Sequence, residues 1–258
     1  MSEYKTIMAT VEDGVGVLTL NRPERLNALT PHMAGEIVAA MAGFPERGAR
    51  AVLLNATGRA FCSGTDLVGT EMPEDVGLLL EESYHPAILR IAAQPLPMVA
   101  AVQGACAGIG ASLALCADFV IAAQSAYFLQ AFVNIGLVPD GGATWMLPRL
   151  VGRARAAQMM MLGERLPAPE AADWGLIYKA VADDALTDDS MALARRLAAG
   201  PTRTLGLIRT GLARAQESTL SETLGLERIN QREAGRSADF TEGVAAFVEK
   251  RPASFRGE

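Results

Sequence analysis

The chain has 258 residues, of which 50% are hydrophobic, and its formal net charge is −6 at pH 7. This length and composition are enough for a large core in one domain or two small ones. The acidic balance disfavours a basic surface for phosphate backbones, so nucleic acid is not an expected partner. The sequence has no apolar run of about 20 residues and no signal-peptide pattern at its start. We therefore expect a cytoplasmic protein without membrane contact.

Four runs of apolar and β-branched residues predict strands in the first half of the chain. They lie at 15–20, 51–56, 97–104 and 118–123. Helical or glycine-punctuated segments separate them. Strands that alternate with helices predict a parallel α/β arrangement.

Helices are expected between these strands. One begins at Pro31, with Thr30 as its N-cap, and continues to about Phe44. A second contains apolar residues at helical spacing, and a third, rich in small residues, lies within 108–117. The apolar residues of the second helical segment are Val76, Leu79, Leu80, Ile88 and Ile91.

The composition changes after about residue 190, where Ala, Leu, Arg and Glu predict consecutive helices with a break at Gly200 and Pro201. We therefore divide the chain into an α/β core at 1–190 and a helical region at 191–258. Several apolar residues of the helical region need a partner surface, which either the core or another subunit must supply. They are Leu220, Leu224, Ile229, Val244, Phe247 and Val248.

The cysteines and histidines give no sign of a metal site. Cys62, Cys106 and Cys116 are odd in number, lack CxxC spacing and lie among small or apolar residues, which is typical of buried thiols. His32 and His85 are separated from any ligand cluster, so we expect no metal site.

The segment GACAGIGASLALCAD, residues 104–118, allows three interpretations. A dinucleotide loop fails because Leu113 stands where the third glycine belongs. A nucleophile elbow fails because the residues around Ser112 read GxSxA and neither histidine is a recognisable partner. The third interpretation is a helix N-terminus whose free N–H groups bind an oxyanion.

The loop FCSGTDL, residues 61–67, offers a second main-chain donor. Ser63 and Gly64 allow a sharp turn that exposes the amide of Thr65. Two converging amides would stabilise the enolate oxygen of an activated carbonyl. A tight turn that only lets the strands and helices pack explains the same residues equally well.

Several motifs, in order, resemble the enoyl-CoA hydratase/isomerase, or crotonase, family. The resemblance spans almost the whole chain, and its later segments are most similar to the bacterial isomerases that act on the ring epoxide of phenylacetyl-CoA. The motifs are NRPERLNAL, AFCSGTDL, PMVAAVQGACAGIGASLALCAD, GLVPDGGATW with LPRLVGRARAAQMMMLGERL, and AGRSADFTEGVAAFVEKRPASF.

The resemblance implies a spiral of repeated ββα units, followed by C-terminal helices that form a homotrimer or a hexamer of two trimers. It implies an acyl-CoA thioester as substrate, with CoA as part of the substrate and not a cofactor. The amides of Thr65 and Ile109 correspond to the family's oxyanion hole. The implied substrate-binding residues are Arg25, Leu26, Ala28, Ala60, Ser63, Gly64, Asp66, Leu67, Gly108, Phe132 and Lys250.

Two departures from the family pattern disfavour hydration. The resemblance implies that hydratases carry one glutamate where this chain has Ser112 and another where it has Phe132. Two carboxylates activate and protonate water across a C=C bond, and neither a hydroxyl nor a phenyl ring does this near neutral pH.

Asp140 is the candidate proton carrier, because isomerase branches of the family use an aspartate in the corresponding PD(S/G)G turn. Its position also suits a purely structural role as an Asx-turn residue or helix N-cap. If it is catalytic, one carboxyl group takes the proton and returns it elsewhere. Four apolar neighbours are expected to exclude water and raise its proton affinity, namely Phe132, Leu137, Val138 and Trp145.

The sequence therefore favours an acyl-CoA isomerase that acts in phenylacetate, other aromatic or fatty acid degradation. One alternative is a hydratase or hydrolase that uses another acid, such as Asp66 or Glu71. A second is a family member that binds acyl-CoA without turning it over.

Overall fold

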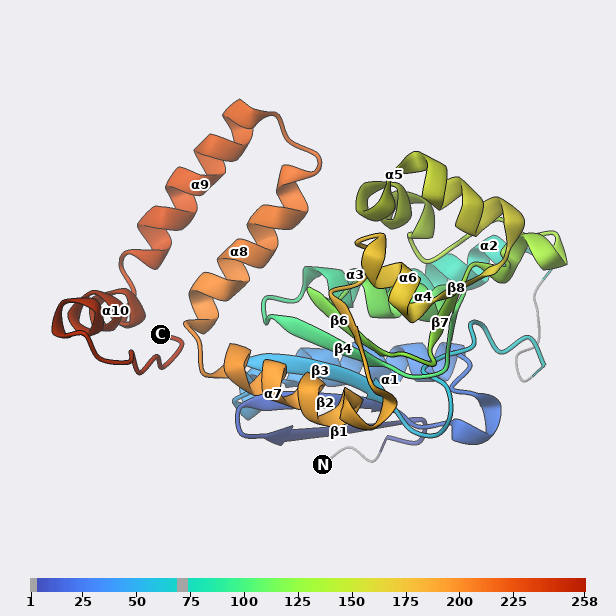
Figure 1. Cartoon of the computed structure of the whole chain (residues 1–258), viewed down its shortest axis with the longest axis horizontal. Helices are drawn as coiled ribbons and strands as arrows, with labels where there is room; N and C mark the ends of the chain where they lie inside the picture. Colours follow the sequence, from blue (N-terminus) through green and yellow to red (C-terminus); the bar gives the residue numbers. More distant parts are fainter. Residues whose placement is uncertain (1–3, 69–73) are drawn as a thin grey trace.

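A six-stranded sheet forms the base of the fold in the computed structural model, which describes residues 4–68 and 74–258 (Figure 1). Its order is β1-β2-β3-β4-β6-β9; β1 pairs antiparallel with β2, and all other neighbours are parallel. The strands are β1 (Ile7–Glu12), β2 (Val15–Leu20), β3 (Ala51–Ala56), β4 (Met98–Val102), β6 (Phe119–Ala123) and β9 (Lys179–Val181).

A small second sheet of β5, β7 and β8 stands beside the first and gives the chain its spiral path. β4 is followed by β5, and β6 by β7, so each turn adds one strand to each sheet before a helical segment begins. The strands of the second sheet are β5 (Ala105–Ala107), β7 (Tyr127–Leu129) and β8 (Arg165–Pro167).

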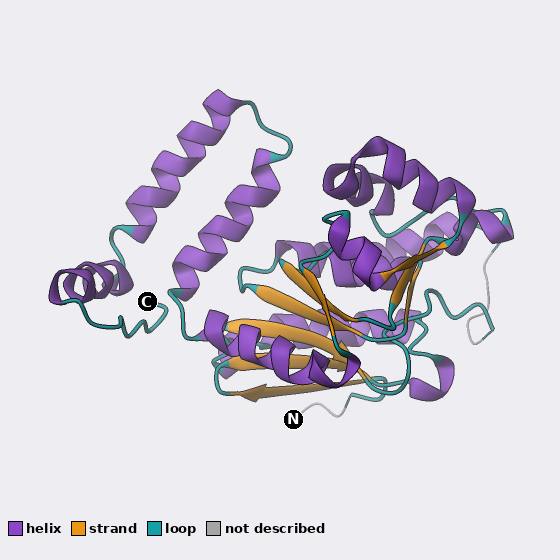
Figure 2. Cartoon of the chain, in the orientation of Figure 1, coloured by secondary structure: helices purple, strands orange, loops and turns teal. Residues whose placement is uncertain are grey.

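Helices cover both faces of the large sheet (Figure 2). On one face α7 packs on β2, β3, β4 and β6. On the other face α1 packs on β1 and β2 and α4 on β4, and α3 packs on these two helices. The apolar core lies between these layers. The helices of this part are α1 (Pro31–Gly43), α2 (Val76–Leu79), α3 (His85–Ala93), α4 (Ile109–Leu115), α5 (Ala143–Leu162), α6 (Ala168–Asp173) and α7 (Leu186–Ala198).

The predicted strands at 15–20 and 51–56 are confirmed as β2 and β3, and those at 97–104 and 118–123 contain β4 and β6. Helix α1 begins at Pro31, where the Thr30 hydroxyl accepts a hydrogen bond from the amide of Met33 at 3.2 Å. The strand β1 and the three-residue strands were not predicted. The helical segment expected over Val76 to Ile91 is interrupted by a π-helical turn at Leu80–Tyr84.

Three further helices extend from the core at the end of the chain (Figure 1). They are α8 (Thr202–Ala215), α9 (Leu220–Ala234) and α10 (Ala238–Glu249). The division expected at residue 190 falls inside α7, which packs on the large sheet, so the extended region begins only after the break at Gly200 and Pro201.

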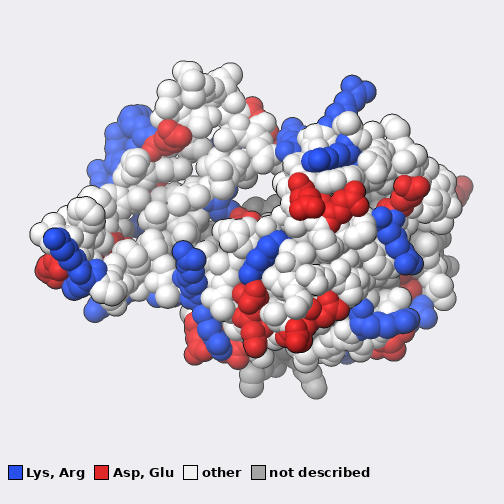
Figure 3. Space-filling view, in the orientation of Figure 1, with Lys and Arg blue, Asp and Glu red and all other residues white. Residues whose placement is uncertain are grey.

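The core does not cover the apolar residues of this helical extension. All six that needed a partner surface are exposed in the single chain, Phe247 to 85%. On the face drawn in Figure 3, the area over α8 is mostly uncharged, whereas acidic and basic side chains crowd the core below it. Along the described residues, no helix is long and apolar enough to cross a membrane.

Arg209 anchors the helical extension to the core. It is 8% exposed, and its guanidinium group forms an ion pair with Asp118 at 2.5 Å. It also donates hydrogen bonds of 3.0–3.1 Å to the main-chain carbonyls of Ile91, Gln94 and Cys116. One buried cation therefore satisfies acceptors from two segments of the core, 91–94 and 116–118.

We expect Arg209→Ala to lower the free energy of unfolding by about 3–5 kcal/mol, because the change leaves buried acceptors without their partner. The matched control is Arg203→Ala in the same helix, which breaks an exposed ion pair with Glu233 and should cost less than about 1 kcal/mol. Urea unfolding at one protein concentration measures both, and equal losses would contradict the assignment.

Candidate active site

Two loops meet at the edge of the two sheets and build the site. The main chain of Cys62 pairs with that of Cys106 as an isolated parallel bridge. The Cys62 amide donates to the Ala105 carbonyl at 3.1 Å, and the Ala107 amide donates to the Cys62 carbonyl at 2.9 Å. This ladder fixes residues 62–65 against the start of α4.

Two glycines allow the loops to approach closely. Gly64 has a φ of +103° and Gly108 a φ of +52°, conformations that other residues rarely adopt. A methyl group placed on Gly108 would lie 3.7 Å from the Cα of Gly64, and 3.4 Å from the ring of Phe132. The residues after these glycines, Thr65 and Ile109, are therefore held side by side.

The amides of Thr65 and Ile109 are available as donors. Ile109 is the first residue of α4, so its N–H has no partner within the helix. Within residues 4–68 and 74–258, neither amide donates a hydrogen bond to another protein group. The positive end of the α4 dipole adds to the preference of this point for negative charge.

Both residues line a cavity of about 210 Å³ whose walls are mostly apolar. The cavity brings together eight of the residues predicted from sequence and several others. Its lining consists of Ser63, Gly64, Thr65, Leu67, Val76, Leu79, Leu80, Tyr84, Gly108, Ile109, Ala131, Phe132, Asn134, Ile135, Leu137 and Asp140.

Asp140 enters the cavity from the turn that precedes α5. The turn packs tightly on α4, because a methyl group on Gly141 would lie 2.9 Å from Cγ1 of Ile109. The N-cap of α5 is Gly142, and no side chain caps this helix. Oδ1 of Asp140 is buried and has no hydrogen-bond partner among the described residues. The side chain is thus not used to stabilise the helix.

Burial raises the pKa of Asp140 from its ordinary value of 3.8 to about 6. The charged carboxylate loses hydration in the apolar cavity, and no cation or donor there compensates for the loss among the described residues. A carboxyl group with such a pKa exchanges a proton readily near neutral pH.

The two positions where the sequence lacks a glutamate lie beside Asp140. Phe132 lines the cavity, and its ring lies next to Gly108, within van der Waals distance of where a side chain on that glycine would be. Ser112 is completely buried under the turn, and its Oγ has no hydrogen-bond partner in the described structure. Asp140 is consequently the one carboxyl group among the described residues that line the cavity.

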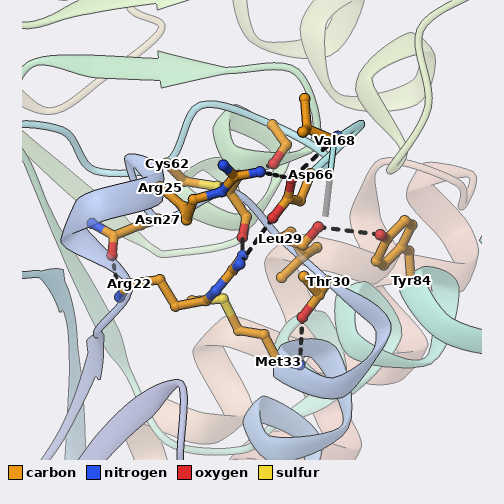
Figure 4. A network of polar contacts seen from close by, with 12 residues as sticks. Arg22, Arg25, Asn27, Leu29, Thr30, Met33, Cys62, Asp66, Val68 and Tyr84 are labelled. Carbon is orange, nitrogen blue, oxygen red and sulfur yellow. Dashed lines mark hydrogen bonds and ion pairs between the residues drawn. The ribbon is translucent and has the colours of Figure 1, made fainter. Parts of the chain in front are cut away.

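Asp66 does not face the cavity, although the sequence placed it in the substrate site and as an alternative acid. It is 3% exposed, and its two oxygens form ion pairs with Arg22 at 2.8 Å and Arg25 at 3.0 Å (Figure 4). The Arg22 guanidinium also hydrogen-bonds the Ala28 carbonyl, at 2.5 Å. This cluster joins the segment at 22–28 to the loop that carries Asp66 and leaves no oxygen of Asp66 in position to activate water in the cavity.

Other residues of the predicted substrate site lie away from the cavity lining. Arg25, Leu26, Ala28 and Ala60 support the loops behind it. Lys250 follows α10, which Figure 1 shows at the opposite end of the molecule from α2. The alternative acid Glu71 lies outside the described residues.

Two of the predicted apolar neighbours of Asp140 do not shield it. Val138 is 80% exposed, and Trp145 is 39% exposed and stacks on Arg149. The expectation for these two side chains was wrong, because Val138, before the turn, and Trp145, in the first turn of α5, are both exposed. The shielding comes from Phe132 and Leu137, as expected, and from apolar residues of α2 and the π-helical turn.

The sequence interpretation missed that α2 and the π-helical turn form a wall of the cavity. Leu79, Leu80 and Tyr84 come from this segment. Leu79 and Leu80 belonged to the spacing that predicted a helix with an apolar face, which is also the pattern of a helix packed on a core, and Tyr84 was not part of that pattern. Nothing in that pattern distinguishes a cavity wall from a packed interface.

Two free main-chain donors and a desolvated carboxyl group on one apolar cavity define a class of site. It suits enzymes that stabilise a developing oxyanion while a nearby group moves a proton. The buried thiols do not contribute, since burial raises the pKa of Cys62 to about 11. No group of three potential metal ligands occurs in the part of the chain that the structure describes.

The known proteins to which this chain is similar include enzymes of this class. The family model for enoyl-CoA hydratase/isomerase matches residues 10–258. The 1,2-epoxyphenylacetyl-CoA isomerase of Escherichia coli K12 is 46% identical to this chain, and the alignment covers 98% of both proteins. A Rhodobacter capsulatus protein named "Probable enoyl-CoA hydratase" is 48% identical, and the alignment covers 98% of this chain and 99% of that relative. The crystal structure of an enoyl-CoA hydratase from Polaromonas sp. JS666 is 35% identical, with a TM-score of 0.91 over 97% of this chain and 99% of that one.

The chain belongs to the enoyl-CoA hydratase/isomerase, or crotonase, family. It is a crotonase-family enzyme, and members of this family act on acyl-CoA thioesters. The fold expected from the sequence motifs, a spiral α/β core with C-terminal helices, is confirmed.

The raised pKa of Asp140 predicts a stability that depends on pH. The folded state holds the proton more tightly than the unfolded chain, so this contribution is fully present below pH 3.8 and is lost as the pH rises through about 6. A rise from 3.8 to about 6 corresponds to about 3 kcal/mol. Asp140→Asn should therefore exceed the wild type in free energy of unfolding by about 2–3 kcal/mol more at pH 8 than at pH 4.

Urea unfolding at the two pH values measures this difference. The control is Asp173→Asn, because Asp173 is exposed at the end of α6. A stability gain of Asp140→Asn that is equal at both pH values would mean that the carboxyl group is not desolvated.

Proposed function

We propose that the protein is an acyl-CoA isomerase that moves a proton or a double bond through an enolate. The observation that carries the proposal is the cavity, where Asp140 is the one carboxyl group among the described lining residues and faces the free amides of Thr65 and Ile109. Isomerisation conserves the atoms of the substrate, so a single proton carrier is sufficient.

In this mechanism the thioester carbonyl oxygen binds between the two amides. Each such donor typically contributes about 3–4 kcal/mol to the stabilisation of an oxyanion. Asp140 in its charged form removes a proton from the carbon next to the carbonyl, and the electron pair moves to the oxygen. The protonated Asp140 then returns the proton to another carbon, and the C=O bond forms again.

The acyl group is unsaturated or carries a ring epoxide. The E. coli relative, named a 1,2-epoxyphenylacetyl-CoA isomerase, supports the ring epoxide and a place in phenylacetate degradation. The apolar walls and the ring of Phe132 support a flat, uncharged acyl group. CoA lies along the loops at residues 25–29 and 60–67, by the resemblance of their motifs.

The second candidate is hydration of a 2-enoyl-CoA, which the name of the Rhodobacter relative favours. It requires an acid besides Asp140, and Asp66 is held in two ion pairs. Incubation with crotonyl-CoA separates the two reactions. Hydration gives a 3-hydroxyacyl product that is heavier by one water, about 18 mass units, whereas isomerisation leaves the mass of the substrate unchanged.

The expected assembly is a homotrimer or a hexamer of two trimers. The exposed apolar side chains of α8, α9 and α10 support it, because a lone chain would leave them in water. Lys250 closes α10 and would reach a bound CoA only from another copy of the chain.

We expect Asp140→Asn to lower kcat/KM by about 10²–10⁴-fold, because the amide keeps the shape of the acid but carries no mobile proton. In the wild type, kcat/KM should rise with pH to a plateau with a midpoint near the Asp140 pKa of about 6, since the charged form takes the proton. Absorbance or mass spectrometry with aryl- and alkenyl-CoA thioesters measures both. Activity of Asp140→Asn near that of the wild type would remove Asp140 from the mechanism.

We expect light scattering to give the mass of three or six chains for the wild type. Phe247→Glu should shift the protein toward smaller species, because it places a charge on an 85% exposed apolar side chain of α10. Glu249→Gln in the same helix is the control and should leave the mass unchanged. A wild-type monomer would contradict the proposed assembly.

A further inference from the structure

Tyr84 is a buried phenol at the cavity that the proposed proton transfer does not use. Its side chain is 0% exposed and lines the cavity with Asp140 and Thr65. It is the last residue of the π-helical turn Leu80–Tyr84, which interrupts the helical segment between α2 and α3. Such turns are rare and occur often at functional sites.

The Tyr84 hydroxyl donates a hydrogen bond of 3.2 Å to the carbonyl oxygen of Leu29 (Figure 4). The same oxygen accepts the amide of Asp66 at 2.9 Å, and the amide of Leu29 donates to the carbonyl of Gly64 at 2.7 Å. Leu29 therefore binds the residues on both sides of Thr65, with which it forms an isolated parallel bridge. The hydrogen bond from Tyr84 holds the carbonyl of Leu29, and thereby the pairing between Leu29 and the residues around Thr65, from the side of the π-helical turn.

The charged and polar groups around the phenol agree with this arrangement. Burial raises the pKa of Tyr84 to about 12, the negative charge of Asp140 adds to the rise, and a hydrogen bond with the Thr65 side chain opposes it. The charges of Asp66 and Cys62 act in the same direction as that of Asp140. With a pKa of about 12, the phenol is neutral near neutral pH and acts there as a hydrogen-bond donor, not as a proton carrier.

We propose that Tyr84 is a positioning residue of the oxyanion site: through the Leu29 carbonyl and the Thr65 side chain it holds the Thr65 N–H in the direction of the thioester oxygen. The proposal rests on the assignment of that amide to the oxyanion, as in the proposed function, and is independent of which carbon receives the proton. A main-chain donor gives its full stabilisation only when it is fixed before the charge develops.

The geometry of the π-helical turn explains how a helix can supply this contact. Leu79, Leu80 and Tyr84 all line the cavity, whereas Ile88 and Ile91 of the following helix are buried in the core. A π-helical turn has one residue more than an α-helical turn. The extra residue allows the segment to present the phenol to Leu29 while α3 keeps its apolar face on the core.

The test uses Tyr84→Phe, which removes only the hydroxyl. The probe is 4-(dimethylamino)cinnamoyl-CoA, whose absorbance shifts to the red when hydrogen bonds polarise its thioester carbonyl. We expect Tyr84→Phe to bind the probe within about twofold of the wild-type Kd but to lose part of the red shift, and to lower kcat about 10-fold with KM little changed. Tyr178→Phe is the control, since Tyr178 is 58% exposed and packs on Phe119.

A full red shift with an unchanged kcat in Tyr84→Phe would overturn the proposal. So would a loss confined to Kd and KM, because the phenol would then contact the substrate directly. The red shift requires no turnover, so a wild type that shifts the probe but isomerises no thioester would contradict the proposed function and leave this test valid.

A second pair of variants keeps the proposal testable if Tyr84→Phe does not fold. Thr65→Val removes the hydroxyl that contacts Tyr84 and keeps the main-chain amide, whereas Thr65→Ser keeps both. We expect the valine variant to lose part of the red shift and the serine variant to retain it. Equal red shifts in the two variants would overturn the role of the Thr65 side chain in this arrangement.

Discussion

The contact between the loops of Gly64 and Gly108 is the constraint on which the site depends. Each loop follows the sheet structure at the same edge, and the bridge between Cys62 and Cys106 sets their register. Both glycines have positive φ angles that other residues rarely adopt. The turns that they form place the next residues, Thr65 and Ile109, on one cavity, where their amides have no partner among the described residues. The proposed oxyanion site is therefore made by the main chain, and the side chains of Thr65 and Ile109 are free to serve packing and positioning.

Two aspartates of the same region show how surroundings decide the role of a carboxyl group. Asp66 is held by two arginines and joins the loops, whereas Asp140 has a buried oxygen without a partner among the described residues and a pKa raised to about 6. Desolvation destabilises the charged form of Asp140, and the fold tolerates this because the turn at Gly141 is packed on α4. In the proposed mechanism, this cost in stability is what allows the carboxyl group to take a proton near neutral pH.

The sequence predicted those elements whose apolar pattern is long enough to read, such as β2, β3 and α1. It did not predict the strands of the second sheet, since β5, β7 and β8 have three residues each and form through main-chain pairing. The family motifs predicted the amides and Asp140 as a set, because their order along the chain carries that information. Outward-facing Val138 and cavity-facing Tyr84 were missed for a common reason: side-chain direction depends on turn geometry, which apolar spacing does not encode.

Percent identity does not decide between hydration and isomerisation for this chain. The relative named a hydratase is 48% identical, and the relative named an isomerase is 46% identical. The number of proton-carrying groups in the cavity is the more direct criterion. Hydration adds the elements of water, so the site must both deprotonate water and protonate carbon, whereas an isomerase returns the proton it has taken. The cavity has Phe132 and a buried Ser112 at the two relevant positions, and Asp140 is the one carboxyl group of its described lining. This set of groups is what supports the proposed isomerase over a hydratase.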